Sequence, residues 1–341
     1  MRNRIQFGLP FLLALILLNG CKPNKQEEKK EAPVPVLSGV DAEIEQLSRE
    51  IVANPKKADA YFQRAKIYVD QKKFKLAAPD INQAVALDST RPDYYFLQAD
   101  VMFANLLVPQ ARETFLKCLS LDPKNVQANL KLAELDLYIK NYKESIQYAN
   151  EALKIDKYQA KAYFIKGFVY KESGDTAKAL STFQTCVEQD PSNYDAYMQL
   201  GILYGFRNNK LAVQYYSSAL KLNPSSIEAL YDRGLFYQDH REFNKAMEDY
   251  TSILKINPNY KDAHYNLGYI HLVYLKVYEQ AIKHFTDAIR CDQYFTQAYY
   301  NRGLCYEYLG DIAAAAADYR QALSIVPSYD LAIKGLKRVR K

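Results

Sequence analysis

The sequence predicts an all-α solenoid, built from helix-turn-helix units that follow one another along the chain. The stretch Thr296 to Tyr329 reads as one complete unit, and comparable stretches precede it at a period of about 34 residues. A small residue and a turn signal recur at the same places in each unit. Units begin at Ala58, Pro92, Val126, Ala160, Tyr194, Ile227, Lys261 and Thr296, which gives eight repeats over residues 58–329.

The composition suits such an array and gives no sign of a nucleic-acid partner. Of 341 residues, 49% are hydrophobic and 25% are charged, as in ordinary folded proteins. The formal net charge of +6 is slight and no sustained basic helix face accompanies it, so we expect no nucleic-acid partner. The 30 Tyr residues, against no Trp, are expected if the repeat keeps an aromatic residue at fixed positions.

Residues 1–20 have the parts of a signal peptide. Two arginines precede an apolar run at 7–18, which is shorter than the roughly 20 residues of a spanning helix and contains Pro10. An uncleaved membrane helix is therefore the weaker alternative. The segment LNGC at 18–21 resembles the lipobox of bacterial lipoproteins, and this resemblance implies a lipid on Cys21 that anchors the chain to a membrane.

Residues 21–40 are predicted to be a disordered tether, because Lys, Glu and Pro dominate and little apolar surface could be buried. Lys22 stands where an aspartate would resemble an inner-membrane retention signal. The resemblance therefore implies an outer-membrane lipoprotein of a Gram-negative-type bacterium, on the periplasmic side or at the cell surface. The charge run at 25–31 also resembles a surface-export tag, although a solvated spacer is the simpler interpretation.

A single helix is predicted at each end of the array. Residues 41–57 place Ile44, Leu47, Ile51 and Val52 at helical spacing, as in the second helix of a half repeat.

Residues 330–341 are predicted to form a capping helix with Leu331, Ile333 and Leu336 inward and basic residues outward. Such a cap seals the last apolar face of an array. The basic side could instead dock an acidic partner or lipid headgroups.

Small residues mark the places where helices approach each other. On the first helix of each unit they are Ala65, Ala99, Ala133, Gly167, Gly201, Gly234, Gly268 and Gly303. On the second helix the matching set is Ala84, Cys118, Ala152, Cys186, Ala219, Ile253, Ala288 and Ala322. Ile253 departs from this pattern and must find extra room.

Turn residues separate the predicted helices. Gly174 and Gly310 are expected in the left-handed conformation, each followed by an aspartate that caps the next helix. Asp-Pro or Asn-Pro pairs at 122–123, 190–191, 223–224 and 257–258 should end second helices. The fifth unit is one residue short near Asn208 and the seventh is one long between Tyr274 and Tyr278, and both changes are predicted at the inter-helix turn.

The spacing of the aromatic, small and proline positions resembles that of a known repeat family. Tyr299, Gly303, Tyr306, Ala315, Tyr319, Ala322 and Pro327 fall in the order and at the distances of the tetratricopeptide repeat. The resemblance implies a right-handed superhelix whose concave inner wall, lined by the first helices, binds extended peptides or partner helices.

The wall positions of this chain are mostly apolar and aromatic, and they lack the lysine and asparagine set of the carboxylate clamp. We expect a partner-binding groove for hydrophobic segments at Phe62, Phe96, Phe164, Phe168, Tyr231, Tyr265, Tyr269, Tyr300 and Leu304. The alternative is that these side chains simply pack against the neighbouring repeat.

The sequence holds no catalytic candidates. The four histidines lack a metal-binding spacing, and His264 and His271 are expected to be buried substitutes for aromatic residues. Nucleophile, nucleotide and dinucleotide motifs are absent, so no cofactor or metal is expected. Cys118 and Cys186 should be inert core thiols. For Cys291 and Cys305 the sequence allows either free thiols or a disulfide between them.

The favoured function is a non-enzymatic scaffold or adaptor, held at the outer membrane and assisting an envelope assembly or secretion machine. Its partners would be other envelope proteins in the groove, and a homo-oligomer is compatible with the sequence. The alternative is a glycan- or nutrient-binding lipoprotein, against which the lack of Trp counts.

Overall fold

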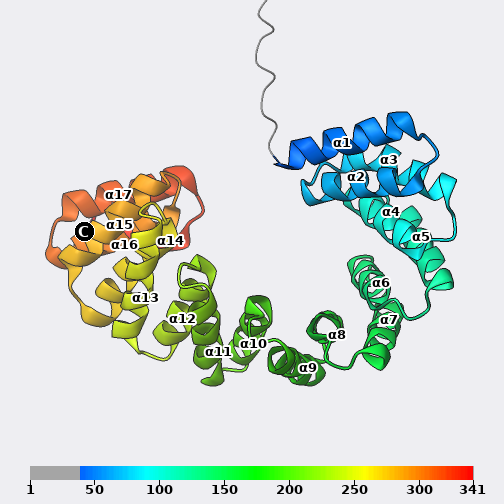
Figure 1. The fold of residues 1–341 in the computed structure, drawn as a ribbon. Coiled ribbons are helices and arrows are strands. Elements are labelled where there is room, and N and C mark those ends of the chain that lie inside the picture. The colour runs from blue at the N-terminus through cyan, green and yellow to red at the C-terminus, as the bar shows by residue number, and fades with distance from the viewer. Residues whose placement is uncertain (1–38, 341) are drawn as a thin grey trace, which may run out of the picture.

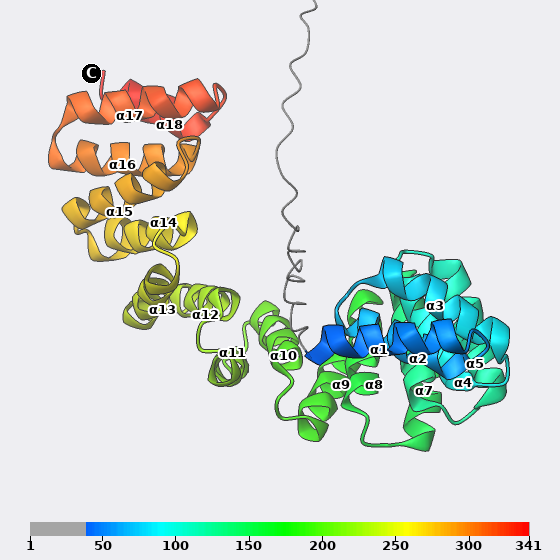
Figure 2. The same ribbon diagram turned by 45° about the horizontal axis from the view of Figure 1, so that its top comes forward.

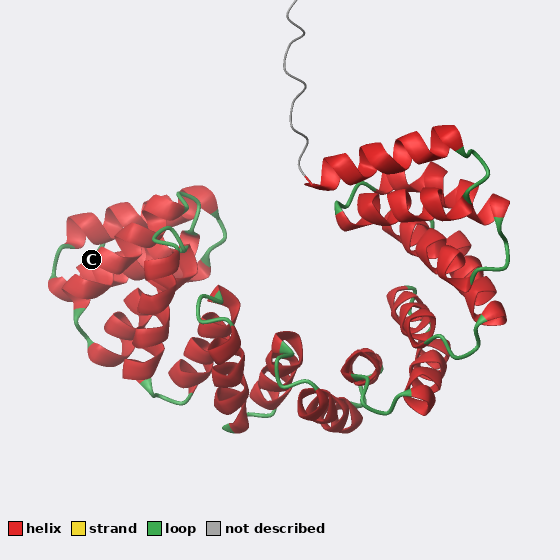
Figure 3. Cartoon of the chain, in the orientation of Figure 1, coloured by secondary structure: helices red, strands yellow, loops and turns green. Residues whose placement is uncertain are grey.

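The computed structural model describes residues 39–340, and every regular element in that range is helical (Figure 3). Consecutive helices pair antiparallel, and the pairs stack into an open arc (Figure 1). The predicted all-α solenoid is thereby confirmed. Within the described range no helix is long and apolar enough to cross a membrane. The predicted signal peptide, Cys21 and most of the predicted tether lie outside the described residues.

Eight helix pairs form the body of the arc. The first helices are α2 (Ala58–Asp70), α4 (Pro92–Ala104), α6 (Val126–Tyr138), α8 (Ala160–Glu172), α10 (Tyr194–Phe206), α12 (Ile227–Asp239), α14 (Lys261–Tyr269) and α16 (Thr296–Leu309). The second helices are α3 (Phe74–Leu87), α5 (Val108–Leu121), α7 (Tyr142–Ile155), α9 (Thr176–Gln189), α11 (Leu211–Leu222), α13 (Phe243–Ile256), α15 (Tyr278–Cys291) and α17 (Ile312–Ile325). Every first helix begins at the residue where the sequence places the start of a repeat.

Helix α1 (Gly39–Ala53) precedes the first pair and starts two residues before the predicted half repeat. It ends just before Asn54-Pro55, because proline disfavours the helical conformation in the residue before it. Val52, one of the four apolar residues that the sequence places at helical spacing, lies away from the core, since it is 81% exposed.

Helix α18 (Asp330–Arg338) closes the other end of the arc. It packs through Ala332, Gly335 and Leu336, and a Cβ built at Gly335 would lie 2.7 Å from the Tyr319 ring. The inward placement of Leu331 is wrong, because that side chain falls at the edge of the packed face and is 46% exposed.

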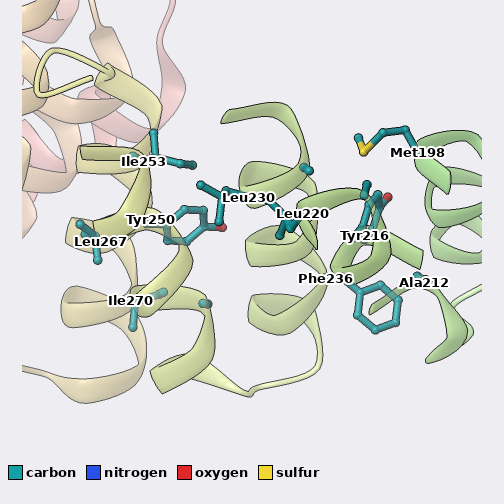
Figure 4. Close-up of a cluster of buried hydrophobic side chains, with 14 residues drawn as sticks. Met198, Ala212, Tyr216, Leu220, Leu230, Phe236, Tyr250, Ile253, Leu267 and Ile270 are labelled. Atoms are coloured by element: carbon teal, nitrogen blue, oxygen red, sulfur yellow. The ribbon is translucent and has the colours of Figure 1, made fainter. Parts of the chain in front are cut away.

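One contact recurs at the crossing of each helix pair. In the five repeats that carry glycine, the ring of a second-helix Phe or Tyr lies on that glycine, and a Cβ would approach the ring to 2.5–2.9 Å. The pairs are Gly167–Phe183, Gly201–Tyr216, Gly234–Tyr250, Gly268–Phe285 and Gly303–Tyr319. Figure 4 shows the core between α10 and α14, where Tyr250 and Ile253 are both fully buried.

The turn between the helices of each pair contains one residue in the left-handed conformation. Gly174 (φ +80°) and Gly310 (φ +82°) were expected there, and Asp175 and Asp311 cap the next helices as predicted. In the other six repeats the residue is not glycine. It is Lys72, Leu106, Lys140, Asn208, Arg241 or Lys276, with φ between +54° and +62°. Each costs roughly 1–2 kcal/mol relative to a right-handed residue.

The two length changes are absorbed differently. In the fifth repeat, Asn208 takes the left-handed position and α11 is shortened to 12 residues. In the seventh repeat the extra residue does not enlarge the turn. It is taken up by a π-helical segment, Ile270–Leu275, which continues α14, because a wider helical turn accommodates one more residue without moving the following helix.

We predict that Gly167→Val lowers the free energy of unfolding by about 1–3 kcal/mol, because the new side chain would overlap the Phe183 ring. The measurement is urea unfolding followed by helical circular dichroism. Gly205→Ala is the matched control, since a Cβ on this helical glycine would meet nothing nearer than 3.5 Å. It should leave stability unchanged or raise it by up to about 1 kcal/mol. Equal losses in both variants would contradict the role given to the crossing contact.

Candidate protein-binding surface

The first helices form the inner side of the arc and the second helices its outer side, as α6, α8 and α10 show in Figure 1. The tilted view in Figure 2 shows the arc rising out of one plane, so the inner wall winds as a broad superhelical surface. The predicted groove residues are spread along this wall. Phe62, Phe96, Phe164, Phe168, Tyr231, Tyr265, Tyr269, Tyr300 and Leu304 are all half-buried.

Part of the aromatic surface at these positions packs against other aromatic rings of the array. The Phe164 and Phe168 rings lie 5.9 and 5.5 Å from Phe183 of the second helix. Tyr265 lies 4.9 Å from Phe295, its hydroxyl accepts a hydrogen bond from Asn301 Nδ2 (3.0 Å), and burial raises its pKa to about 12. These half-buried rings therefore pack against neighbouring helices and are also partly exposed on the wall.

A second set of aromatic residues, absent from the predicted groove, is more exposed. Tyr138, Phe206 and Tyr308 occupy the same place in the last turn of α6, α10 and α16, and they are 65%, 86% and 57% exposed. Their signal in the sequence is an aromatic residue five places after the small crossing residue. Because the crossing position dominates the repeat pattern, this second spacing is easily overlooked.

A hollow of about 310 Å³ opens on the inner wall between α10 and α12. Its lining is Ile202, Gly205, Phe206, Tyr216, Asp232, Leu235, Phe236 and Asp239. Burial, together with the negative charge of Glu228, raises the pKa of Asp232 to about 6. Among residues 39–340 no cation or hydrogen-bond donor is paired with this carboxylate.

The wall is held in place by a repeated polar link, here called the arginine rung. Arg233 on α12 pairs through two nitrogens with Asp249 on α13 (2.9 and 2.6 Å) and donates to Ser217 Oγ on α11 (2.9 Å). Two further rungs have the same spacing, Arg64 with Asp80 and Ser48, and Arg302 with Asp318 and Thr286. Such bidentate pairs are geometrically specific, so they fix the angle between three successive helices.

Three histidines meet where α14, the π-helical segment and α15 pack together. The His284 ring lies 5.4 Å from His271 and 6.3 Å from His264, and burial together with the two neighbouring imidazoles lowers the pKa of His284 to about 4. His264 is buried, as expected, and its Nε2 donates to the Pro258 carbonyl (2.9 Å), whereas His271 is half-buried. No group of three or more ligand-type side chains in the described part of the chain is arranged to hold a metal ion.

The cysteines that the structure describes are free thiols. Cys118 and Cys186 are buried, and burial raises their pKa values to about 11 and about 12, which suits inert core positions. Cys291 and Cys305 do not form a disulfide, and Cys305 is fully buried.

Comparison with protein families identifies the repeat. Residues 58–91, 160–193, 227–260 and 296–329 each match a tetratricopeptide repeat family. All four matches begin at the first residue of a first helix. The chain therefore contains tetratricopeptide repeats, and the remaining four helix pairs continue the same architecture.

Curated proteins with similar sequences cover most of this chain. Tetratricopeptide repeat protein 16 of Homo sapiens is 23% identical over 312 residues, covering 82% of this chain and 36% of that protein. DnaJ homolog subfamily C member 3 of Rattus norvegicus is 25% identical over 251 residues, covering 65% of this chain and 49% of its own length. This chain thus spans half or less of these curated relatives.

Solved structures agree on the fold. The C-terminal part of a repeat-containing protein from Cytophaga hutchinsonii superposes with a TM-score of 0.63 at 19% identity, covering 71% of this chain and 99% of that one. The pilF protein of Pseudomonas aeruginosa gives 0.53 at 18% identity, covering 59% and 92%.

We predict that Asp232→Asn raises the melting temperature at neutral pH. The folded state holds the Asp232 pKa above its ordinary value, so ionised Asp232 destabilises the fold, and this penalty disappears as the pH falls from above 6 to below about 4. The increase in melting temperature of the variant over wild type should therefore be clear at about pH 7.5 and small at about pH 4.5. Glu248→Gln, at an exposed carboxylate on α13, is the control. A variant no more stable than wild type at neutral pH would contradict the unpaired state of Asp232.

Proposed function

We propose that this protein is a non-enzymatic scaffold that binds other proteins along the inner wall of its arc. Tetratricopeptide repeat proteins act as protein–protein interaction scaffolds. The observation that carries the proposal is the aromatic content of the first helices, whose half-buried groove residues are accompanied by exposed Tyr138, Phe206 and Tyr308 in the last turns of α6, α10 and α16. Exposed aromatic surface of this kind is typical of partner sites and of binding hot spots.

The proposal extends to a place in the cell. The lipobox-like segment supports lipidation of Cys21 and anchoring in the outer membrane, with the arc on the periplasmic side or at the cell surface. A tethered array of this size is suited to assisting an envelope assembly or secretion machine. Its partners would then be other envelope proteins.

A catalytic role has less support. The human protein O-mannosyl-transferase TMTC3 and a peptide N-acetylglucosaminyltransferase of Giardia intestinalis are among the relatives, but the matches cover 18% and 6% of those proteins. The proposed scaffold function therefore rests on the repeat fold and the wall, and no activity is transferred from these relatives.

For the anchor, we predict that Cys21→Ser moves the protein from the membrane fraction to the soluble fraction. A thioether-linked lipid requires the cysteine sulfur, and acyl chains contribute about 0.8 kcal/mol per buried CH₂ to membrane binding. The measurement is fractionation followed by immunoblotting, with Ser38→Ala as the control within the same segment. Retention of the serine variant in membranes would refute lipid anchoring at this residue.

For the wall, we predict that replacing Tyr138, Phe206 and Tyr308 together by serine reduces crosslinking to partner proteins in cells at least about tenfold, because hot-spot aromatics commonly contribute about 2 kcal/mol or more each. Crosslinked peptides are quantified by mass spectrometry.

The matched control replaces Tyr158 and Tyr294 by serine, since these are 64% and 78% exposed but lie in the connections between repeats. If the control loses its crosslinks and the wall variant keeps them, partners bind elsewhere on the array.

A further inference from the structure

A tyrosine on the second helix of the fifth repeat lacks a hydrogen bond that its counterparts make. In the sixth repeat the Tyr250 hydroxyl donates to Gln238 Oε1 (3.2 Å), and in the eighth the Tyr319 hydroxyl donates to Glu307 Oε2 (2.6 Å). Both acceptors lie in the last part of the first helix. Tyr216 holds the same place in the fifth repeat and is only 5% exposed, yet no partner for its hydroxyl is found among the described residues.

The missing partner is explained by Gly205, which stands where the sixth and eighth repeats carry Gln238 and Glu307. This glycine is not required for packing. A Cβ at Gly205 would lie 3.5 Å from the Tyr216 hydroxyl and 4.0 Å from Phe236, which are ordinary contact distances. Its backbone is also helical, so it needs no glycine-specific conformation. Gly205 therefore leaves a space, and this space is the hollow of about 310 Å³ on the inner wall.

The hollow combines an apolar lining with negative charge that is not neutralised. Ile202, Leu235 and Phe236 line it, and Phe206 stands 86% exposed at its edge. Asp232 and Asp239 belong to the same lining.

The nearest basic side chain in sequence to Asp232 is directed elsewhere. Arg233 is held by Asp249 and Ser217 in an arginine rung. Glu228, one helical turn from Asp232, adds negative charge and so makes the carboxylate more costly to ionise. A half-buried carboxylate without a partner destabilises a fold, and a cation that enters the site removes this penalty.

We propose that this hollow, the Gly205 subsite, binds a lysine or arginine side chain of an extended segment of the partner protein. The cationic group donates hydrogen bonds to the Asp232 carboxylate and to the Tyr216 hydroxyl oxygen, while its aliphatic stem lies on Ile202 and Leu235. The exposed Phe206 ring offers its face to the same cation. This inference rests on the proposed function, because it assigns a charge preference to one position of the scaffold's inner wall.

The test uses labelled peptides of defined sequence and the full chain in detergent micelles. The probe is fluorescein-Gly-Leu-Ala-Lys-Ala-Leu-amide, with versions that carry arginine, norleucine or glutamate in place of lysine, and binding is followed by fluorescence anisotropy. The lysine and arginine peptides should bind at least about tenfold more tightly than the norleucine peptide, because a charge-assisted contact contributes on the order of 1.5–3 kcal/mol. The glutamate peptide should bind most weakly.

Gly205→Gln supplies the decisive variant, because it restores the arrangement of Gln238 and Tyr250 and fills the hollow. It should remove the preference for a basic residue while melting at or above the wild-type temperature, so that lost preference cannot be ascribed to unfolding. Asp232→Asn should likewise remove the preference. Gly205→Ala, which fills little of the space, is the matched control and should keep it.

The outcomes separate this inference from the proposed function. Equal binding of the lysine and norleucine peptides to wild type overturns the subsite and leaves an apolar wall that still binds peptides. A basic preference that survives in Gly205→Gln also overturns it, because the cation is then held elsewhere. If no peptide binds, the subsite is overturned as well. The scaffold function is decided separately, by the crosslinking of the Tyr138, Phe206 and Tyr308 variant.

Discussion

The close approach of two helices within each repeat is the constraint on which the rest of this structure depends. A ring from the second helix occupies the space above a small residue of the first, and a Cβ on any of the five crossing glycines would enter that ring. Because interiors are packed to crystal-like density, this contact fixes both the separation and the crossing angle of each pair. The arc, its inner wall and the positions of the wall residues follow from repeating that one geometry.

The sequence predicts this part of the molecule well for a physical reason. Crossing residues, helix ends and Asx-Pro pairs act locally, so their spacing shows where helices begin, and each of the eight first helices starts where the pattern places it. The misplaced residues lie at the ends of the array. Val52 and Leu331 belong to helices with a neighbour on only one side, where helical spacing alone does not reveal which face is covered.

Features that depend on several helices at once were harder to predict. Left-handed Leu106 and Lys276 show that the turn geometry is imposed by the helix pair, so glycine is not a sufficient signal for it. The unpaired state of Asp232 depends on what neighbouring helices fail to supply, and the unpaired Tyr216 hydroxyl depends on a side chain that Gly205 does not have. A repeat pattern read along the chain emphasises what recurs, whereas the candidate site lies where one repeat departs from the others.

The arginine rungs give the array an uneven mechanical character. They hold together the helices around Arg64, Arg233 and Arg302, whereas Leu132, Leu200 and Leu267 occupy the corresponding place in the third, fifth and seventh repeats and are buried there without directional bonds. Apolar contacts tolerate sliding better than bidentate ion pairs do, so we expect bending to concentrate at these leucine joints. Bending is then easiest at the third, fifth and seventh repeats, and the hollow between α10 and α12 lies where the fifth repeat meets the sixth, which an arginine rung holds.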